Sequence, residues 1–231
     1  MSDSTALDSF LDKWRARWPE WRSAEIFVLP PHRRVCVAWF ALLQEFEDAM
    51  NIAGDPLPAD AKLAWWGQEL RDWAGHRSRH PLGRILEPQA APWESLADTL
   101  PDLIAARETS ADPAQAFGHL RAYAAAVVAV ENALMAGQSG ESAIQAVVAQ
   151  TLYARAAALG DAALWATPAP GQDTAEALLG RWPAPSEAAR ERRLWSALAR
   201  QRLQRRGSDG SAAPMASPLR LLLASWRAAR G

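Results

Sequence analysis

Apolar residues recur along most of the chain at spacings of three and four, the period of an α-helix that buries one face. Between residues 58 and 74, for example, Leu63, Trp66 and Leu70 lie on one such stripe. No segment alternates apolar and polar residues for long enough to predict a strand. Prolines and glycines divide the pattern into separate segments. The expected helices cover residues 4–18, 32–50, 58–74, 94–107, 113–135, 141–159, 173–179, 187–206 and 219–229, with a short element at 80–88.

Two consecutive segments, 113–135 and 141–159, are rich in alanine and apolar on nearly all sides, which predicts helices in the middle of a bundle. The short Gly/Ser turn between them predicts an antiparallel hairpin. Pro101 is expected to kink or split the helix that precedes this pair, because proline removes a helical hydrogen bond. Ser186 is expected to cap the helix that follows the pair.

The whole pattern predicts an all-α fold, a single helical bundle domain over residues 1–231. An N-terminal helix is expected within residues 1–20. The stretch 207–218 is rich in Gly, Ser, Ala and Pro and predicts a flexible loop. A C-terminal helix is expected at 219–231.

Composition adds little that is unusual, except in the aromatic residues. The chain has 231 residues, 49% of them hydrophobic, with a formal net charge of -1, which is ordinary for a globular protein and argues against a nucleic-acid binder. Abundant alanine and only two lysines among 25 basic residues indicate GC-rich, bacterial coding. The single cysteine, Cys36, lies in an apolar run and is expected to be buried. Twelve tryptophans either fill the core or line a roomy aromatic space.

The chain shows neither a signal-peptide pattern at its N-terminus nor a stretch near the ~18 apolar residues of a membrane span. We therefore expect a cytoplasmic protein, or one attached to a membrane surface. The basic segment 191–206, which intersperses arginines with Leu and Trp, could make such a peripheral contact with anionic lipid. The alternative is a solvated arginine face.

Four short motifs follow one another between residues 26 and 86. They are Leu-Pro-Pro-His-Arg-Arg at 29–34, Phe-Glu-Asp-Ala-Met-Asn at 46–51, Lys-Leu-Ala-Trp-Trp-Gly-Gln-Glu-Leu at 62–70, and Arg-His-Pro-Leu at 79–82. In this order and spacing the series resembles the squalene/phytoene synthase family, the head-to-head prenyl transferases of the isoprenoid-synthase fold. The resemblance covers about a quarter of the chain well. The middle helices match only in pattern, and the C-terminal third matches loosely.

In that family, two Asp-x-x-x-Asp motifs on facing helices hold the Mg²⁺ ions that grip the substrate diphosphates, because residues i and i+4 share one helix face. The resemblance sets the first motif at Glu47, Asp48 and Asn51, so that one carboxylate is lengthened and another lost. Gln44 stands where family enzymes carry a diphosphate-binding arginine, and Gly67 replaces a second arginine. Arg33 and Arg34 are the remaining positions on the diphosphate side.

The second motif is eroded further. The best register sets residues 157–162 against the family's Arg-Asp-Val-Gly-Glu-Asp, which puts Ala158 and Ala162 at the metal-binding positions and leaves Asp161 as the nearby acid. Alanine cannot ligate Mg²⁺. The resemblance also implies a substrate pocket, whose lining would come from Phe40, Leu43, Trp66, Glu69, Tyr123 and Tyr153.

Two further groups of residues invite a functional interpretation. His76 and His80 are four apart and could ligate zinc on a helix, but the flanking arginines and Pro81 favour a surface loop. Glu131, followed by Asn132, ends an apolar helical run, where an acid is costly unless it is partnered. It is either a pocket acid that replaces a lost one or a salt-bridged residue at an exposed edge.

Three functional hypotheses stay open. The first is a family relative that no longer catalyses the synthase reaction and that binds an isoprenoid or lipid, or acts as an accessory or assembly factor with a protein partner. The second is an active prenyltransferase that uses Glu47, Asp48 and Asp161 in an unusual Mg²⁺ geometry. The third is a helical scaffold whose cavity is filled by tryptophan and which binds only protein. No cofactor is expected, except Mg²⁺ if the protein is active.

Overall fold

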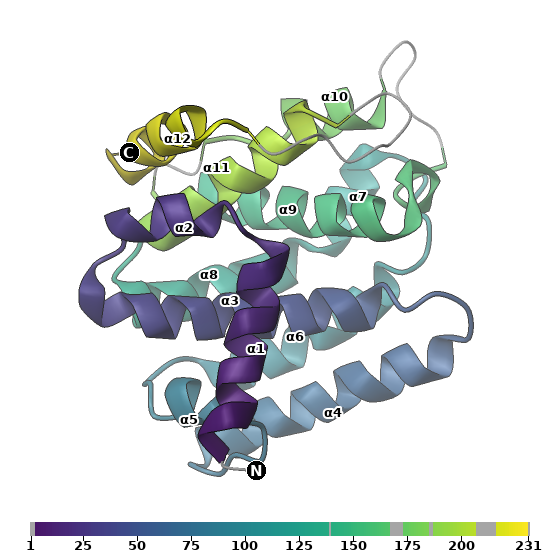
Figure 1. The fold of residues 1–231 in the computed structure, drawn as a ribbon. Coiled ribbons are helices and arrows are strands. Elements are labelled where there is room, and N and C mark those ends of the chain that lie inside the picture. The colour runs from purple at the N-terminus through teal and green to yellow at the C-terminus, as the bar shows by residue number, and fades with distance from the viewer. Residues whose placement is uncertain (1–2, 139, 167–172, 185–186, 207–215, 231) are drawn as a thin grey trace.

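A computed structural model describes the chain except for residues 1–2, 139, 167–172, 185–186, 207–215 and 231 (Figure 1). The described residues form helices and no strand, so the all-α prediction is confirmed. A lone parallel bridge joins Ser110 to Trp165. The helices are α1 (Asp3–Arg17), α2 (Trp21–Ala24), α3 (Arg33–Met50), α4 (Pro56–Ala74), α5 (Gly83–Leu86), α6 (Trp93–Ala105), α7 (Pro113–His119), α8 (Arg121–Met135), α9 (Glu141–Leu159), α10 (Thr174–Gly180), α11 (Arg190–Gln204) and α12 (Pro218–Arg230), with 3₁₀ turns η1 (Glu25–Phe27), η2 (Pro30–His32) and η3 (Asp161–Ala163).

Helix α3 runs through the middle of the bundle (Figure 1). Its sequence is apolar on several faces, and most of its residues are buried. The pair α4 and α6 packs at one end of the molecule, and α8, α9 and α11 continue the bundle toward the other. Helix α1 crosses over α3, and α12 lies against α11 and α2 at the end opposite α4.

Ten of the twelve tryptophans are buried, and Trp65 and Trp226 are exposed. One aromatic cluster surrounds Phe40 of α3, where the rings of Trp14, Trp21 and Trp195 lie with their centroids 5.6, 5.5 and 4.4 Å from that of Phe40. These separations are those of directly packed aromatic pairs. At this place the tryptophans fill the core.

The predicted helix 113–135 is wrong, because the structure divides it into α7 and α8 at Leu120. Asp112 caps α7 by accepting a hydrogen bond from the Gln115 amide, and Gly118 weakens the helix just before the break. Leu120 itself is fully buried. Because the apolar pattern runs through Leu120 without interruption, the pattern alone predicts one helix.

Pro101 does not split its helix, since α6 continues from Trp93 to Ala105. The proline is exposed, and the helix continues past it although the hydrogen bond to the carbonyl four residues earlier is lost. Helix α11 begins at Arg190, and the predicted cap at Ser186 lies outside the described residues, as do positions 207–215 of the predicted loop.

Cys36 is fully buried, as predicted, and donates its thiol hydrogen to the Arg33 carbonyl over 3.3 Å. Burial raises the pKa of this thiol well above its usual value. Among the described residues, no helix has the length and apolar character needed to cross a membrane.

Candidate functional site

A polar cluster lies buried where four helices meet, and we call Trp39, Glu131, Gln150 and Arg192 the central cluster. Glu131 of α8 and Arg192 of α11 form an ion pair, and each side chain is 1% exposed. The Arg192 Nε donates to both Glu131 oxygens, over 2.9 and 3.0 Å. Trp39 of α3 donates its indole N–H to Glu131 over 2.9 Å, and Arg192 Nη1 donates to Gln150 Oε1 of α9 over 3.1 Å.

Two aromatic faces complete the surroundings of Arg192. Its guanidinium lies 4.9 Å from the ring centroid of Trp195 and 5.5 Å from that of Phe40, within the range of cation–π attraction. A buried charge that is paired, hydrogen-bonded and enclosed by rings in this way holds neighbouring elements together. The central cluster therefore ties α3, α8, α9 and α11 to one another.

Glu131 thus fits neither of its two predicted roles as stated. It is salt-bridged, as one alternative required, but it lies deep in the bundle rather than at an exposed edge. The reason is Arg192, which sits three residues before Trp195 and seven before Ala199 on the buried face of α11. Two signals for this pair are present in the sequence. Arg192 is in register with the apolar stripe of α11, and Glu131 is an acid in an apolar stretch, where a buried carboxylate needs a cation as partner.

Glu47, the first position of the eroded motif, is half-buried on α3 and accepts no hydrogen bond from the described residues. Burial is the main cause that raises the pKa of Glu47 to about 8. The charge of Arg17 lowers this pKa, that of Asp48 raises it, and that of Arg192 lowers it. The same carboxyl contributes, after burial, to raising the pKa of Tyr123 on α8. Glu47 therefore lies near Tyr123 and the central cluster.

Asp48 is turned away from Glu47, toward α1. Its two oxygens accept hydrogen bonds from Arg17 Nη1 over 2.7 Å and from Lys13 Nζ over 3.2 Å. Lys13 also donates to Glu45 over 2.7 Å. Asp48 is therefore committed to holding α1 against α3.

Asn51 and the end of α9 face each other through Arg155. The Arg155 side chain, on a residue that is 5% exposed, donates to Asn51 Oδ1 over 3.4 Å, to the Ala163 carbonyl over 3.1 Å and to the Arg107 carbonyl. Burial lowers the pKa of Arg155, and the nearby Arg107 adds to this effect. A guanidinium thus bridges the two segments that the resemblance assigns to the first and second metal motifs.

At the second motif, Asp161 accepts a hydrogen bond from Arg206 Nη1 over 2.7 Å. Ala158 and Ala162 are exposed and bring no polar atom to this place. In the described residues no three His, Cys, Asp or Glu side chains are grouped so as to hold a metal ion.

The positions on the predicted diphosphate side are dispersed. Arg33 donates to the Val28 carbonyl over 3.1 Å, and Arg34 is exposed beside Asp8, with 3.7 Å between the charged groups. Gln44 is buried on α3, and its Oε1 has no hydrogen-bond partner among the described residues.

The six predicted pocket residues divide among three places. Phe40 and Tyr123 lie beside the central cluster, and Leu43 is buried one turn along α3 from Phe40. Tyr153 is half-buried on α9, with its ring centroid 6.1 Å from that of Trp182. Trp66 and Glu69 of α4 lie instead against the loop that contains His80. Described side chains thus bring part of the predicted pocket together.

The histidine pair sits in a loop, as the favoured interpretation had it. His76 is exposed, has φ +56° and lies 2.9 Å from a Glu87 oxygen. His80 is half-buried against Trp66, at 4.6 Å between ring centroids, and burial lowers its pKa to about 4. Its Nδ1 accepts the Leu82 amide hydrogen over 3.2 Å, so this histidine orders the loop.

Several arginines of the basic segment 191–206 face inward. Besides Arg192, Arg193 donates to the carbonyls of Ala188, Ala228 and Ala229 over 2.8 to 2.9 Å. Arg202 donates to Glu20 over 2.5 and 2.9 Å and lies 3.9 Å from the Trp18 ring centroid. These arginines tie α11 to α8, to α12 and to the turn that follows α1.

The raised pKa of Glu47 leads to a pH prediction. An unfolded glutamate ionises near pH 4.5, whereas folded Glu47 holds its proton up to about pH 8, so the stabilisation is complete below pH 4.5 and is lost as the pH rises to 8. Because water reaches part of this side chain, we expect a loss of about 2 kcal/mol over that window. Glu47→Gln cannot ionise, so it should remove this slope.

Urea unfolding of wild type and Glu47→Gln at several pH values from 4.5 to 9 measures the effect. Asp12→Asn serves as the control, since this exposed carboxylate on α1 is not among the charges that shift the pKa of Glu47. Parallel pH profiles for wild type and Glu47→Gln would show that Glu47 ionises normally in the folded protein.

No protein-family model matches the chain, and no curated protein matches it either.

Proposed function

We propose that this protein is a helical bundle of the isoprenoid-synthase type, related to squalene/phytoene synthases, that no longer catalyses the synthase reaction and acts as an accessory or assembly factor. The observation that carries the proposal is the cation that faces the motif on α3. Where the family would place Mg²⁺ between two acidic motifs, Arg155 bonds to Asn51, and Arg192 lies near Glu47.

The chemistry of these groups supports a non-catalytic role. Arginine keeps its charge and its place, while Mg²⁺-dependent ionisation needs an open coordination site that binds and releases diphosphate. Asp48 and Asp161 are already engaged by Arg17, Lys13 and Arg206, so recruiting them to a metal would break ion pairs within the protein. The neutral form of Glu47 below about pH 8 also weakens it as a metal ligand.

The core around Phe40 is too tightly packed to hold a prenyl chain, which favours a function in which the protein acts through its surface. Phe40 is packed by Trp14, Trp21, Trp195 and the Arg192 guanidinium. A prenyl chain at this place would have to displace rings that are fully buried. This feature also speaks for the scaffold hypothesis, in which the protein has a protein partner and no interior ligand.

The proposal predicts no release of inorganic diphosphate when the protein is incubated with farnesyl or geranylgeranyl diphosphate and Mg²⁺. The measurement is a coupled diphosphate assay together with chromatography for squalene and phytoene. Mg²⁺-dependent release that Glu47→Ala abolishes, and that Asp12→Ala on the exposed side of α1 leaves intact, would overturn the proposal in favour of an active prenyltransferase. Titration with Mn²⁺, followed by electron paramagnetic resonance, should likewise show no tight site.

A further inference from the structure

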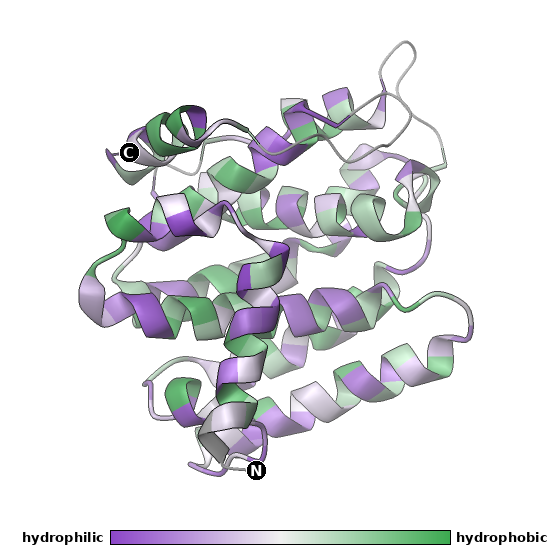
Figure 2. Ribbon diagram, viewed as in Figure 1, coloured by the Kyte–Doolittle hydropathy of each residue, from purple (hydrophilic) through white to green (hydrophobic). Residues whose placement is uncertain are grey.

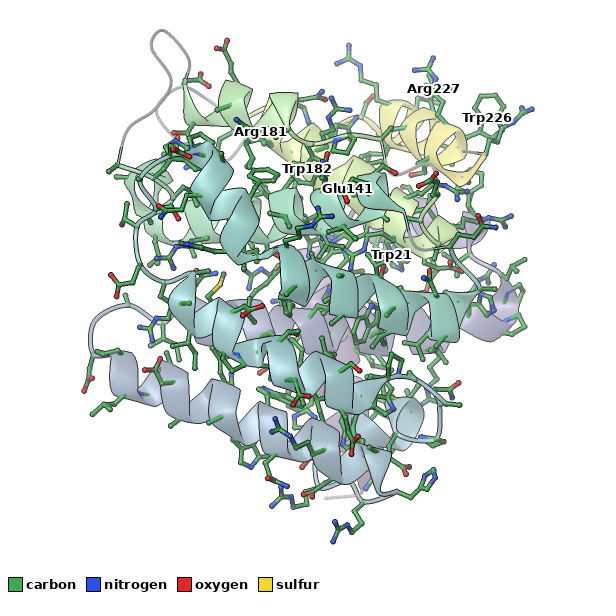
Figure 3. The ribbon with its side chains drawn as sticks, turned by 180° about the vertical axis from the view of Figure 1, so that it is seen from behind. Trp21, Glu141, Arg181, Trp182, Trp226 and Arg227 are labelled. Carbon is green, nitrogen blue, oxygen red and sulfur yellow. The ribbon has the colours of Figure 1, made fainter. Side chains whose placement is uncertain are left out.

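Helix α12 carries apolar side chains on two faces. Leu221 and Ser225 are buried against the bundle, where α12 packs on α11 and α2. On its other side, four large apolar residues at spacings of three and four form a stripe in solvent, which we call the α12 stripe. They are Leu219, Leu222, Leu223 and Trp226, with exposed fractions of 80, 40, 47 and 44%. Figure 2 shows hydrophobic residues along the α12 ribbon, and in Figure 3 Trp226 projects outward from it.

Two more exposed apolar side chains lie in or near a turn that packs against α12. Helix α12 packs against η1, in which Ile26 is 59% exposed, and Leu29 follows shortly after, at 49%. These two residues and the α12 stripe account for most of the exposed large apolar side chains of the described residues. Single exposed leucines are ordinary on a protein surface, but a group of this kind on one end of a molecule marks an interaction site.

The charged residues of α12 itself are all basic. Helix α12 contains Arg220, Arg227 and Arg230, all exposed, and no acidic residue. The Arg230 guanidinium lies 4.7 Å from the Trp226 ring centroid, which keeps a cation at the edge of the apolar stripe. An apolar face bordered by arginines, with an aromatic residue at the boundary, matches the boundary between acyl chains and anionic headgroups of a bilayer.

A groove between α11 and α12 lies next to these arginines. It has a volume of about 350 Å³, and Arg193, Arg200, Gln201 and Arg227 line it together with alanines, without any acidic side chain. The Arg193 guanidinium is committed to backbone carbonyls, but Arg200 Nε is buried and has no hydrogen-bond partner among the described residues. The groove thus offers the two cations Arg200 and Arg227 to a phosphate group.

We propose that the α12 stripe and the adjoining groove form the surface by which this protein binds an anionic phospholipid bilayer. The stripe enters the acyl boundary, and Arg200 and Arg227 receive the headgroup phosphates. This contact is independent of whether the protein catalyses any reaction. From α11 the contact uses Arg200 alone, since Arg192, Arg193 and Arg202 of that helix are bonded within the protein.

A second copy of the chain, or an apolar protein partner, fits this surface less well. Two α12 stripes placed face to face would bring Arg220, Arg227 and Arg230 of both copies together with no acid on either helix. An anionic membrane supplies the missing negative charge over the whole patch.

The test is flotation of the full-length protein with vesicles of phosphatidylcholine, with and without phosphatidylglycerol. Wild type should float only with the anionic vesicles, and raised salt should weaken binding. The variant Arg200→Gln/Arg227→Gln should bind about 25-fold more weakly, which is about fivefold for each arginine, or ~1 kcal/mol each. The variant Leu222→Ser/Trp226→Ser should lose at least about tenfold, because its apolar contact is removed.

A matched control comes from the opposite end of the molecule. Leu57→Ser/Arg77→Gln also removes one exposed leucine and one exposed arginine, near the two ends of α4, and should bind as wild type does (Figure 1). Because Leu222 and Trp226 are exposed, we expect their replacement to leave the fold intact. Thermal unfolding of each variant checks this.

Three outcomes would overturn the proposal. They are no flotation with either kind of vesicle, equal binding by wild type and both α12 variants, and a dimer in sedimentation velocity that Leu222→Ser/Trp226→Ser dissolves while no vesicle is bound. The last result would assign the stripe to a second copy of the chain.

Discussion

Replacing Arg192 by methionine should lower the free energy of unfolding by about 3–5 kcal/mol, the cost of leaving a buried carboxylate without its partner. Methionine roughly keeps the volume but removes every hydrogen bond that Arg192 donates to Glu131 and Gln150. It also removes the cation that lies against Trp195 and Phe40. Urea unfolding measures the change from the midpoint at constant slope.

The control for this prediction is the double variant Arg192→Met/Glu131→Gln. Glutamine carries no charge but still offers an oxygen to the Trp39 indole N–H, which Glu131 accepts in the wild type. The double variant should therefore recover much of the stability lost in Arg192→Met, because the destabilising species is the unpaired buried charge. If Arg192→Met alone stays within about 1 kcal/mol of wild type, the ion pair does not hold the bundle together.

Replacing Glu69 by alanine should have the second largest effect, a loss of about 3 kcal/mol. Glu69 is fully buried on α4, and its Oε1 accepts hydrogen bonds from the Trp73 indole and from the backbone amides of Arg79 and His80, over 2.9, 2.7 and 2.8 Å. Its Oε2 accepts from Arg79 Nε over 3.1 Å. Alanine leaves these donors without an acceptor and releases the loop that ends α4.

Hydrogen exchange at the Arg79 and His80 amides should rise in Glu69→Ala, and urea unfolding should give the loss of stability. Asp72→Ala is the control, because Asp72 pairs with the same Arg79 over 3.0 Å at the surface, where the expected cost is under about 1 kcal/mol. Equal losses of stability in the two variants would mean that the buried hydrogen bonds of Glu69 contribute no more than a surface ion pair.

The Glu69 contribution should also depend on pH in a direction opposite to that of Glu47. Burial alone would raise the pKa of Glu69, but the hydrogen bonds from His80, Arg79 and Trp73 outweigh it and lower the pKa below its usual 4.5. The stabilisation is therefore complete above pH 4.5 and is lost as the pH falls below that value.

For the candidate site, the sequence predicted which helix carries each residue better than it predicted which residues that side chain contacts. Residues 46–50 lie on α3, which ends at Met50 as expected, and Asn51 directly after it meets Arg155 of α9. Nothing in the spacing of residues 47, 48 and 51 indicated that Asp48 turns to α1 while Asn51 turns to α9. Those directions depend on which helix packs on each side of α3.

The central cluster could not be predicted from the sequence, because its members are far apart along the chain. Arg192 and Glu131 are 61 residues apart, and Trp39 and Glu131 are 92 apart, so no local pattern connects them. Among six arginines in residues 191–206, only the packing of α11 against the bundle decides which one is buried. The same holds for Glu69, whose partners are in a loop that has no helical period.

The sequence by itself determined that this protein is helical, where most of its helices begin and end, and that Cys36 is buried, because helical period, proline and glycine act over a few residues. Only the tertiary structure decided that α7 and α8 separate at Leu120. It likewise decided that Arg155 bonds to Asn51 and that Arg192 bonds to Glu131. It also decided that α12 keeps one apolar face in solvent. An amphipathic pattern fixes which side of a helix is apolar, but only the arrangement of the other helices fixes what that side meets.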